Sequence, residues 1–304
     1  MNGESNMNLS SYLIYAQNCL LGESSIWDDR SNSLYWIDIV RPAIHRFNFN
    51  KNQHNFWLMP DKIACIGLNK SGGLFVVLSR SFALFDPDNT SQIKLTPLNT
   101  PQILNQNVMF NDGKCDRSGR FWVGTKDLSE TAPNGNFYKL NADLQLELVD
   151  QKFTVFNGPA WSPDNKICYF CDSPQQIIYK CDFNLDTGTL HHKEVFAKVV
   201  EKNSYPDGIT VDSDGFLWCC HWGGGRVVRY DPTGKISQTI KIPALQPTSC
   251  CFGGPHLTLL YVTSAIVGLS RAQLEQYPES GCVFHFETHI KGLKEPMVLL
   301  KAHL

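Results

Sequence analysis

The chain has 304 residues, of which 42% are hydrophobic and 18% are charged, and its formal net charge is -2. This share of apolar residues is enough for a sizeable core and excludes an intrinsically disordered chain. The charge is close to neutral and contains no block of like charges, which argues against nucleic acid or an acidic membrane surface as a partner and favours a small neutral or anionic ligand.

Six similar segments follow one another along the chain, each a polar turn that leads into an aromatic or aliphatic strand. They are residues 33–36, 73–76, 120–123, 167–170, 216–219 and 259–262. One aromatic residue marks each segment, at positions 35, 75, 122, 169, 218 and 261, so the successive spacings are 40, 47, 47, 49 and 43 residues. The four-stranded blades of β-propellers repeat every roughly 40 to 50 residues. The repeat therefore predicts an all-β fold, a six-bladed β-propeller.

The two ends of the sequence predict how this ring of blades is closed. Residues 12–16 form an apolar run before the first repeat, and residues 281–286 are typical of a strand after the last one. A propeller removes its open sheet edges when a strand from the opposite terminus completes the last blade. We expect a single domain over residues 1–304, with the last blade closed by an N-terminal strand and residues 1–10 as a flexible extension. An open pair of β-sandwiches, without regular spacing, is the alternative.

The N-terminus and the cysteines predict a cytoplasmic location. Residues 1–10 lack the basic segment and apolar run of a secretory signal, and no stretch is apolar for long enough to cross a bilayer. The eleven cysteines are an odd number and are scattered along the chain, as expected for free thiols in a reducing compartment. We expect a monomer or a small homo-oligomer, with no nucleic-acid and no membrane partner.

Four repeats carry a side-chain oxygen where the inner strand of the blade is expected to begin, 11 or 12 residues before the marker aromatic. These residues are Glu23, Asn111, Asn157 and Asp207. Because inner strands surround the propeller axis, their starts line the mouth of the central channel. Carboxylate and amide oxygens suit hard cations such as calcium or magnesium, and no His or Cys in the same phase indicates a dedicated zinc site. Tight turns are the alternative interpretation, because Asn-Gly and Asp-Gly dipeptides occur at these positions.

Around these residues the sequence resembles the senescence marker protein, gluconolactonase and regucalcin family, over roughly residues 15–290. The matching segments are residues 22–24 with Trp27, 110–114, 157–159, 162–164, 206–210, 223–227 and 248–254. The resemblance implies one divalent metal ion in the channel, held by Glu23, Asn157 and Asp207. Calcium is the first choice, with zinc, manganese or magnesium as alternatives. The implied activity is hydrolysis of a small-molecule sugar lactone, an aldonolactone, to the aldonic acid.

The resemblance also assigns residues to the substrate, with one departure from the family. Asn111 corresponds to a polar contact with the substrate or a metal-bound water. Glu130 corresponds to a carboxylate that contacts the sugar, with Ser129 as the competing match. The family often carries Arg, which contacts sugar hydroxyls, at the position of Met109. An apolar side chain here replaces a cation with five donors, so the usual gluconolactone preference need not hold for this chain.

Lactone hydrolysis requires a polarised carbonyl group and an activated water. A divalent ion supplies Lewis acidity, and Asp207 is our candidate for the general base. Two other functions fit the same residues: a non-catalytic calcium-binding regulatory propeller, and a phosphotriesterase-like hydrolase, because a metal that polarises C=O also polarises P=O. A protein-binding propeller that has lost its chemistry is a third. No Gly-x-Ser-x-Gly elbow indicates a serine hydrolase. For His221 we favour a structural role, or one that supports a site residue, over the alternative role of a base.

Overall fold

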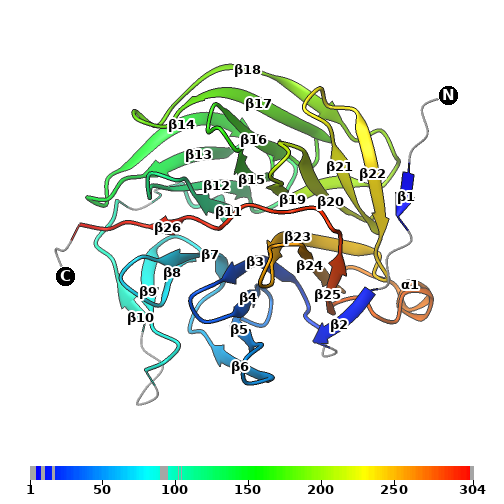
Figure 1. Cartoon of the computed structure of the whole chain (residues 1–304). Helices are drawn as coiled ribbons and strands as arrows, with labels where there is room; N and C mark the ends of the chain where they lie inside the picture. The colour runs from blue at the N-terminus through cyan, green and yellow to red at the C-terminus, as the bar shows by residue number, and fades with distance from the viewer. Residues whose placement is uncertain are drawn as a thin grey trace.

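The computed structural model describes residues 5–7, 11–15, 18–89, 95–101, 103 and 105–301. Within them, six sheets stand around one axis as the blades of a propeller (Figure 1). In five blades the chain runs outward from the axis through four antiparallel strands in sequence order, and in the sixth the outer strand is β2 from the N-terminal segment. The regular spacing of the repeats therefore arises from a closed ring of blades, which confirms the propeller and excludes an open pair of sandwiches.

The strands of the first three blades have the following bounds. Blade 1 contains β3 (Gly22–Asp28), β4 (Ser33–Asp38), β5 (Ala43–Asn48) and β6 (Gln53–Leu58). Blade 2 contains β7 (Ile63–Asn69), β8 (Leu74–Leu78), β9 (Phe82–Phe85) and β10 (Leu95–Pro97). Blade 3 contains β11 (Val108–Cys115), β12 (Phe121–Asp127), β13 (Gly135–Leu140) and β14 (Leu146–Phe153).

The other three blades continue the pattern. Blade 4 contains β15 (Phe156–Trp161), β16 (Ile167–Asp172), β17 (Ile177–Asn184) and β18 (Thr189–Lys198). Blade 5 contains β19 (Tyr205–Val211), β20 (Leu217–Trp222), β21 (Arg226–Tyr230) and β22 (Ile236–Lys241). Blade 6 contains β23 (Gln246–Gly253), β24 (Leu259–Ala265), β25 (Val283–Glu287) and β2 (Ser11–Tyr15). A short helix, α1 (Arg271–Gln276), lies between β24 and β25.

The marker aromatics of the sequence repeat lie in the second strand of every blade and are buried. They are Tyr35, Phe75, Trp122, Tyr169, Trp218 and Tyr261. Within the described residues, the apolar core is divided into six clusters, each of which lies between two neighbouring blades. Phe75 of blade 2, for example, packs against Phe121 of blade 3 with their ring centroids 4.8 Å apart. Sheets therefore pack face to face around the ring, and the inner strands are left to surround the channel.

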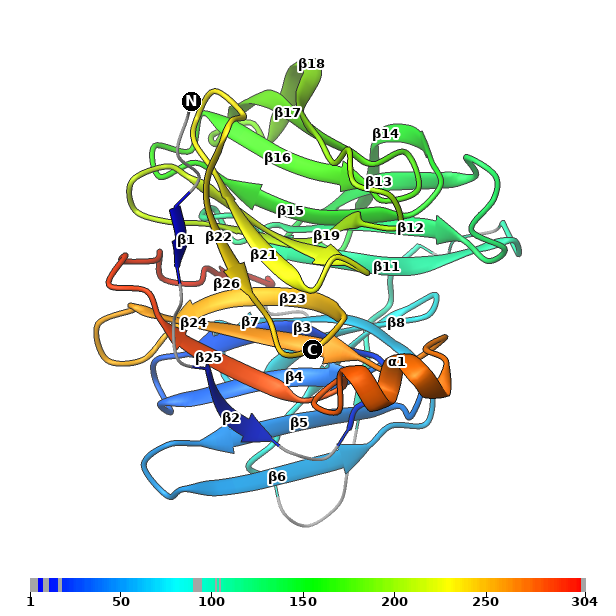
Figure 2. The same ribbon diagram turned by 90° about the vertical axis from the view of Figure 1, so that its right-hand side faces the viewer.

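The N-terminal segment adds one strand to each of two blades (Figure 2). β2 pairs antiparallel with β25, with Ser11 opposite Phe286, which confirms that an N-terminal strand closes the last blade. β1 (Ser5–Met7) pairs parallel with the outer strand β22. This pairing differs from the expected flexible extension over residues 1–10, because the open edge of β22 accepts one more strand. The other residues of that extension lie outside the described part of the chain.

The C-terminal segment crosses the ring at the ends of the inner strands (red in Figure 1). The backbone N–H of Ser213, just after β19, donates to the carbonyl oxygen of Lys291 at 2.8 Å. β26 (Met297–Val298) pairs parallel with β7, and the N–H of Leu299 donates to the carbonyl oxygen of Gly119 at 2.9 Å. The segment thus ties blades 2, 3 and 5 together at the end of the channel opposite the strand starts. No helix among the described residues is long and apolar enough to span a membrane.

Candidate active site

A β-bulge interrupts every inner strand near its start. The pairing with the second strand shifts register after Glu23 in β3, Ile63 in β7, Phe110 in β11, Asn157 in β15, Pro206 in β19 and Pro247 in β23. A bulge leaves a residue outside the ladder and re-aims its side chain. The Asn-Gly and Asp-Gly dipeptides of β15 and β19 therefore lie inside strands, so the interpretation of these dipeptides as tight turns is wrong.

Two of the predicted site residues are in direct contact across neighbouring blades. The Nδ2 atom of Asn111 donates to Oδ1 of Asn157 at 3.0 Å and to the carbonyl oxygen of Phe156 at 2.8 Å. The Nδ2 atom of Asn157 donates to Oγ of Ser173 at 2.7 Å, and that hydroxyl donates to the carbonyl oxygen of Pro206 at 2.6 Å. This chain of hydrogen bonds runs from blade 3 through blade 4 to the residue before Asp207. It fixes the orientation of the Asn157 amide and leaves its oxygen a second lone pair.

The carboxylates of Glu23 and Asp207 interact with each other across the channel mouth. Desolvation raises the pKa of Glu23 well above its usual value, and the negative charges of Asp207 and Asp112 raise it further. Desolvation likewise raises the pKa of Asp207, followed by the charge of Asp112. Opposing these effects are the backbone N–H of Ser24, which donates to Glu23 Oε2 at 3.2 Å, and a smaller contribution from Lys126 to both carboxylates.

A divalent cation fits this donor set. Among the described residues, neither Glu23 nor Asp207 forms an ion pair within 4 Å with Lys, Arg or His, so the distant charge of Lys126 offsets their repulsion only in part. In the same part of the chain, no group of three His, Cys, Asp or Glu side chains is placed to hold a metal ion. A site at the mouth therefore needs a third oxygen of another kind, and the oriented amide of Asn157 carries one. Such oxygen ligands are typical of calcium.

Asp112 also belongs to this region, although the sequence interpretation did not include it among the site residues. Its Oδ2 accepts from the backbone N–H of Gly158 at 2.8 Å, and its Oδ1 accepts from that of Gly113 at 2.8 Å. The first bond holds the bulge of β15 against that of β11, directly beside Asn157. Its position between Asn111 and Gly113 in an Asn-Asp-Gly run is the signal that identifies it.

Blade 3 also carries Met109, Lys126 and Glu130 close to Asn111 in the strand pairing. Met109 is buried and is the register partner of Lys126 on β12. Glu130 follows β12 with a φ of 55°, and its Oε1 is 2.6 Å from Nζ of Lys126. The competing residue Ser129 donates its hydroxyl to Asp127 instead. Lys126 was missed at the sequence level, because only the strand register shows that it stands opposite Met109.

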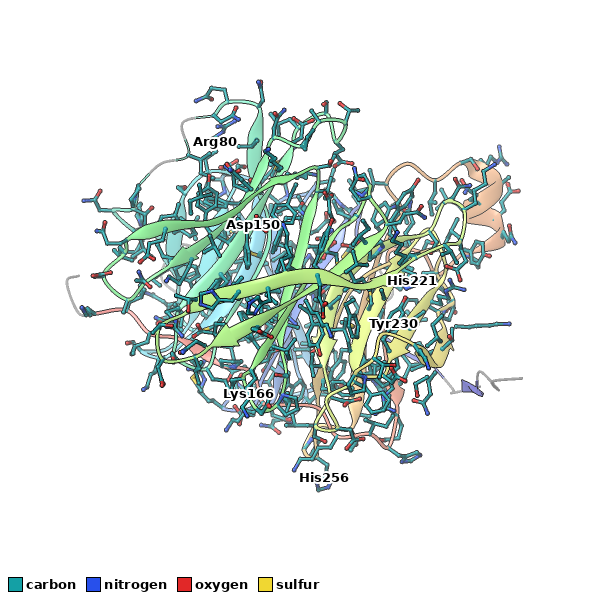
Figure 3. All side chains as sticks on the ribbon, turned by 90° about the horizontal axis from the view of Figure 1, so that it is seen from above. Arg80, Asp150, Lys166, His221, Tyr230 and His256 are labelled. Carbon is teal, nitrogen blue, oxygen red and sulfur yellow. The ribbon has the colours of Figure 1, made fainter. Side chains whose placement is uncertain are left out.

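His221 lies behind β19, inside the protein. It is completely buried, and its Nε2 is 3.0 Å from the hydroxyl of Tyr230, which is labelled beside it in Figure 3. The Nε atom of Arg226 donates to its Nδ1 at 3.3 Å. Desolvation lowers the pKa of His221 to about 3. Its backbone pairs with Pro206, next to Asp207. These contacts agree with a structural role that supports the start of β19.

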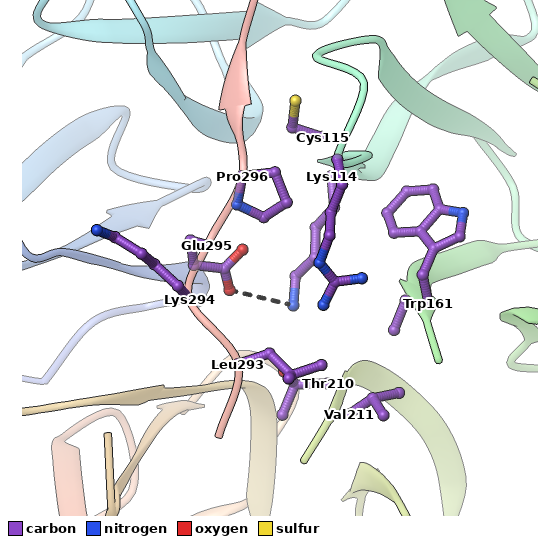
Figure 4. Close-up of a pocket in the computed structure, with 11 residues that line it drawn as sticks. Lys114, Cys115, Trp161, Thr210, Val211, Leu293, Lys294, Glu295 and Pro296 are labelled. Carbon is purple, nitrogen blue, oxygen red and sulfur yellow. Dashed lines mark ion pairs between the residues drawn. The ribbon is translucent and has the colours of Figure 1, made fainter. Parts of the chain in front are cut away.

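The opposite end of the channel holds a small pocket beneath the C-terminal segment (Figure 4). Lys114 of β11 projects into it, where its Nζ donates to the carbonyl oxygen of Ile209 at 2.9 Å and lies 3.9 Å from Oε1 of Glu295. This pair is formed between an inner strand and the C-terminal segment. The pair of Lys114 and Glu295 therefore closes the base of the channel. It is separate from Glu23, Asn157 and Asp207, which lie near the starts of their strands at the other end.

This chain is similar to known proteins in sequence and in fold. Residues 21–266 match the SMP-30/Gluconolactonase/LRE-like region. Regucalcin of Sus scrofa is 35% identical over 288 residues, which are 92% of this chain and 95% of that protein. L-arabinolactonase of Azospirillum brasilense is 37% identical over 277 residues, 90% of each chain. The crystal structure of a calcium-binding protein, regucalcin, from Agrobacterium tumefaciens shares the fold, with a TM-score of 0.90, 24% identity and coverage of 96% and 98%. The chain therefore belongs to the SMP-30/gluconolactonase/LRE-like family.

Proposed function

We propose that this protein is a metal-dependent hydrolase of sugar lactones. Membership of the family and the similarity to an L-arabinolactonase support a lactonase-like function. The observation that carries the proposal is the pair of desolvated, mutually repelling carboxylates of Glu23 and Asp207 at the channel mouth, beside an oriented amide at Asn157. This combination costs stability unless a cation neutralises it.

Glu23, Asn157 and Asp207 are the proposed ligands of one divalent cation. Calcium is the first choice because all three donors are oxygens, and the fold is shared with a protein described as calcium-binding. Zinc, manganese and magnesium are the alternatives. When bound, the cation supplies Lewis acidity toward the lactone carbonyl.

Asp207 is the proposed general base. A carboxylate next to the proposed cation is suited to accept a proton from a water molecule and to return it. As the oxygen of a water molecule bonds to the lactone carbonyl carbon, Asp207 takes the proton of that water. The bond between the carbonyl carbon and the ring oxygen then breaks, and the proton passes to the ring oxygen, which becomes a hydroxyl group of the aldonic acid.

The substrate is proposed to be an aldonolactone that lies over Met109 and contacts Asn111 and Glu130. Asn111 offers its carbonyl oxygen, since its Nδ2 is engaged by Asn157 and Phe156. Met109 offers an apolar surface to the C–H face of a sugar ring. Because no guanidinium stands at this position, we expect a preference different from that of relatives with Arg.

A calcium-binding propeller without catalysis is the second candidate, and the name regucalcin of several relatives favours it. The test is an assay of purified, calcium-loaded protein on pentonolactones and hexonolactones, with an aryl phosphotriester in parallel and acid release followed at constant pH. Turnover of an aldonolactone above that of an Asp207→Ala variant supports the proposal. Calcium binding without turnover favours the regulator, and turnover of the phosphotriester alone would favour a phosphotriesterase.

The state of the cysteines supports the predicted cytoplasmic location of the protein. All eleven cysteines are free thiols and buried. Unpaired thiols in this number suit a reducing compartment, so we propose a cytoplasmic enzyme. Its expected oligomeric state, a monomer or a small homo-oligomer, can be measured by light scattering.

A further inference from the structure

Lys126 lies between the inner strands of two blades at the channel mouth. Its backbone pairs with Met109 of β11 on one side and forms an isolated bridge with Val155, just before β15, on the other. The N–H of the next residue, Asp127, donates to the carbonyl oxygen of Thr154 at 2.9 Å. The main chain at Lys126 is therefore held on both sides, and the start of its side chain is fixed relative to Asn111 and Asn157.

The ammonium group of Lys126 is held by one partner and has donors left over. Its Nζ lies 2.6 Å from Oε1 of Glu130, and 20% of its side chain is exposed. An ammonium group has three N–H donors. The ion pair with Glu130 uses one of them, and no other hydrogen bond or ion pair of this Nζ occurs within the described residues.

The positive charge of Lys126 also acts on the two carboxylates at the mouth. Desolvation is the main effect on Glu23 and Asp207 and raises the pKa of both, whereas the positive charge of Lys126 lowers both. Lys126 thus carries a positive charge that acts on both carboxylates, and its backbone is paired with that of Met109.

We infer that Lys126 is a substrate-binding residue whose ammonium group donates a hydrogen bond to a hydroxyl oxygen of the bound sugar lactone. This inference rests on the proposed function and names a contact within it. Glu130 positions the ammonium group through the 2.6 Å ion pair, and Met109 forms the apolar surface beside it. A cation and an anion held side by side at a channel mouth present a donor and an acceptor, as adjacent sugar hydroxyls require.

The test compares the wild-type protein with Lys126→Met and Lys126→Arg on two substrates, an aldonolactone and unsubstituted δ-valerolactone, at saturating calcium. Loss of a hydrogen bond from a charged donor lowers kcat/KM for the aldonolactone by roughly 10- to 100-fold. We expect most of this change in KM, because the contact is made in the ground state as well as in the transition state. The value for δ-valerolactone stays within about 3-fold, because it has no hydroxyl group to bind, and Lys126→Arg recovers part of the loss.

A matched control is Lys180→Met on the outer strands of blade 4. Lys180 also forms an ion pair with a glutamate, Glu194, at 3.0 Å, and its side chain is 30% exposed. This variant leaves both substrates unaffected. Calcium affinity, measured by calorimetry, is not weakened by Lys126→Met, because removal of a positive charge near the carboxylates does not oppose cation binding.

The outcomes separate this inference from the proposed function. If wild-type protein turns over the aldonolactone and Lys126→Met equals it, the role of Lys126 is overturned while the lactonase proposal stands. An equal loss on both substrates, or weaker calcium binding, indicates a structural role and also overturns it. If wild-type protein neither binds nor turns over any aldonolactone, both proposals are wrong.

Discussion

Asn111 donates a hydrogen bond of 3.0 Å to the amide oxygen of Asn157, so two residues 46 positions apart in the sequence meet at the channel mouth. The bond orients a proposed metal ligand from a neighbouring blade. Groups that orient a ligand without binding the metal themselves commonly tune metal affinity.

Asn111→Ala is therefore expected to weaken calcium binding by roughly 10- to 100-fold, because the Asn157 amide loses the donor that holds it. Isothermal titration calorimetry on metal-depleted protein measures the change. Asn55→Ala, on the outer strand β6, is the control and keeps the wild-type affinity. Unchanged affinity in Asn111→Ala would contradict the role of this hydrogen bond.

Asp207→Asn is expected to act in opposite directions on activity and on stability. Lactone hydrolysis falls by at least about 100-fold, because the general base and one cation ligand are lost. The metal-free variant, however, is more stable than metal-free wild type by on the order of 1 kcal/mol, since a repelling buried charge is removed. Urea unfolding after chelation measures this difference. A variant that is less stable without metal contradicts the assigned electrostatics.

The buried imidazole of His221 predicts a loss of stability in acid. Desolvation lowers the pKa of His221 to about 3 in the folded protein, whereas an unfolded chain takes up this proton near pH 6.5. Stability is thus fully present above about pH 6.5 and is lost as the pH falls toward the folded pKa. At pH 5 the loss due to His221 is roughly 2 kcal/mol.

Urea unfolding at pH 7.5 and pH 5.0 tests this sign. The decrease in unfolding free energy between the two pH values is expected to be about 2 kcal/mol smaller in His221→Gln than in wild type. His256, which is exposed and labelled in Figure 3, supplies the control. We expect His256→Gln to show the same decrease in unfolding free energy between the two pH values as wild type, because its side chain is not buried on folding. An equal decrease in His221→Gln and wild type shows that His221 is not held neutral.

The blades were predictable from the sequence because they rest on a local pattern. Each aromatic marker, such as Trp122 or Trp218, fills the space between two sheets. The number of residues between successive markers therefore equals the length of one blade. The positions of Glu23 and Asp207 near the starts of the inner strands β3 and β19 followed from the same period. Closure by β2 was predictable as well, since an edge strand of the last blade requires a partner.

Features that depend on register or on distant backbone contacts were not predictable. Lys126 lies opposite Met109 because of the register in which β11 pairs with β12. The bulge after Phe110 then shifts the pairing of the residues that follow it in β11. The strand β26 is too short to have a pattern of its own and pairs with β7 from the other end of the chain. The orientation of Asn157 depends on hydrogen bonds across three blades, which no local sequence pattern encodes.

The central claim is that Glu23, Asn157 and Asp207 hold one cation on which lactone hydrolysis depends. The most direct measurement is the rate of aldonolactone hydrolysis by protein that has been depleted of metal and then titrated with calcium, alongside calorimetric stoichiometry. We predict that activity is lost on depletion, returns with one calcium ion per chain, and does not return in Glu23→Gln. Full activity after verified metal depletion, or wild-type calcium binding in Glu23→Gln, would contradict the account.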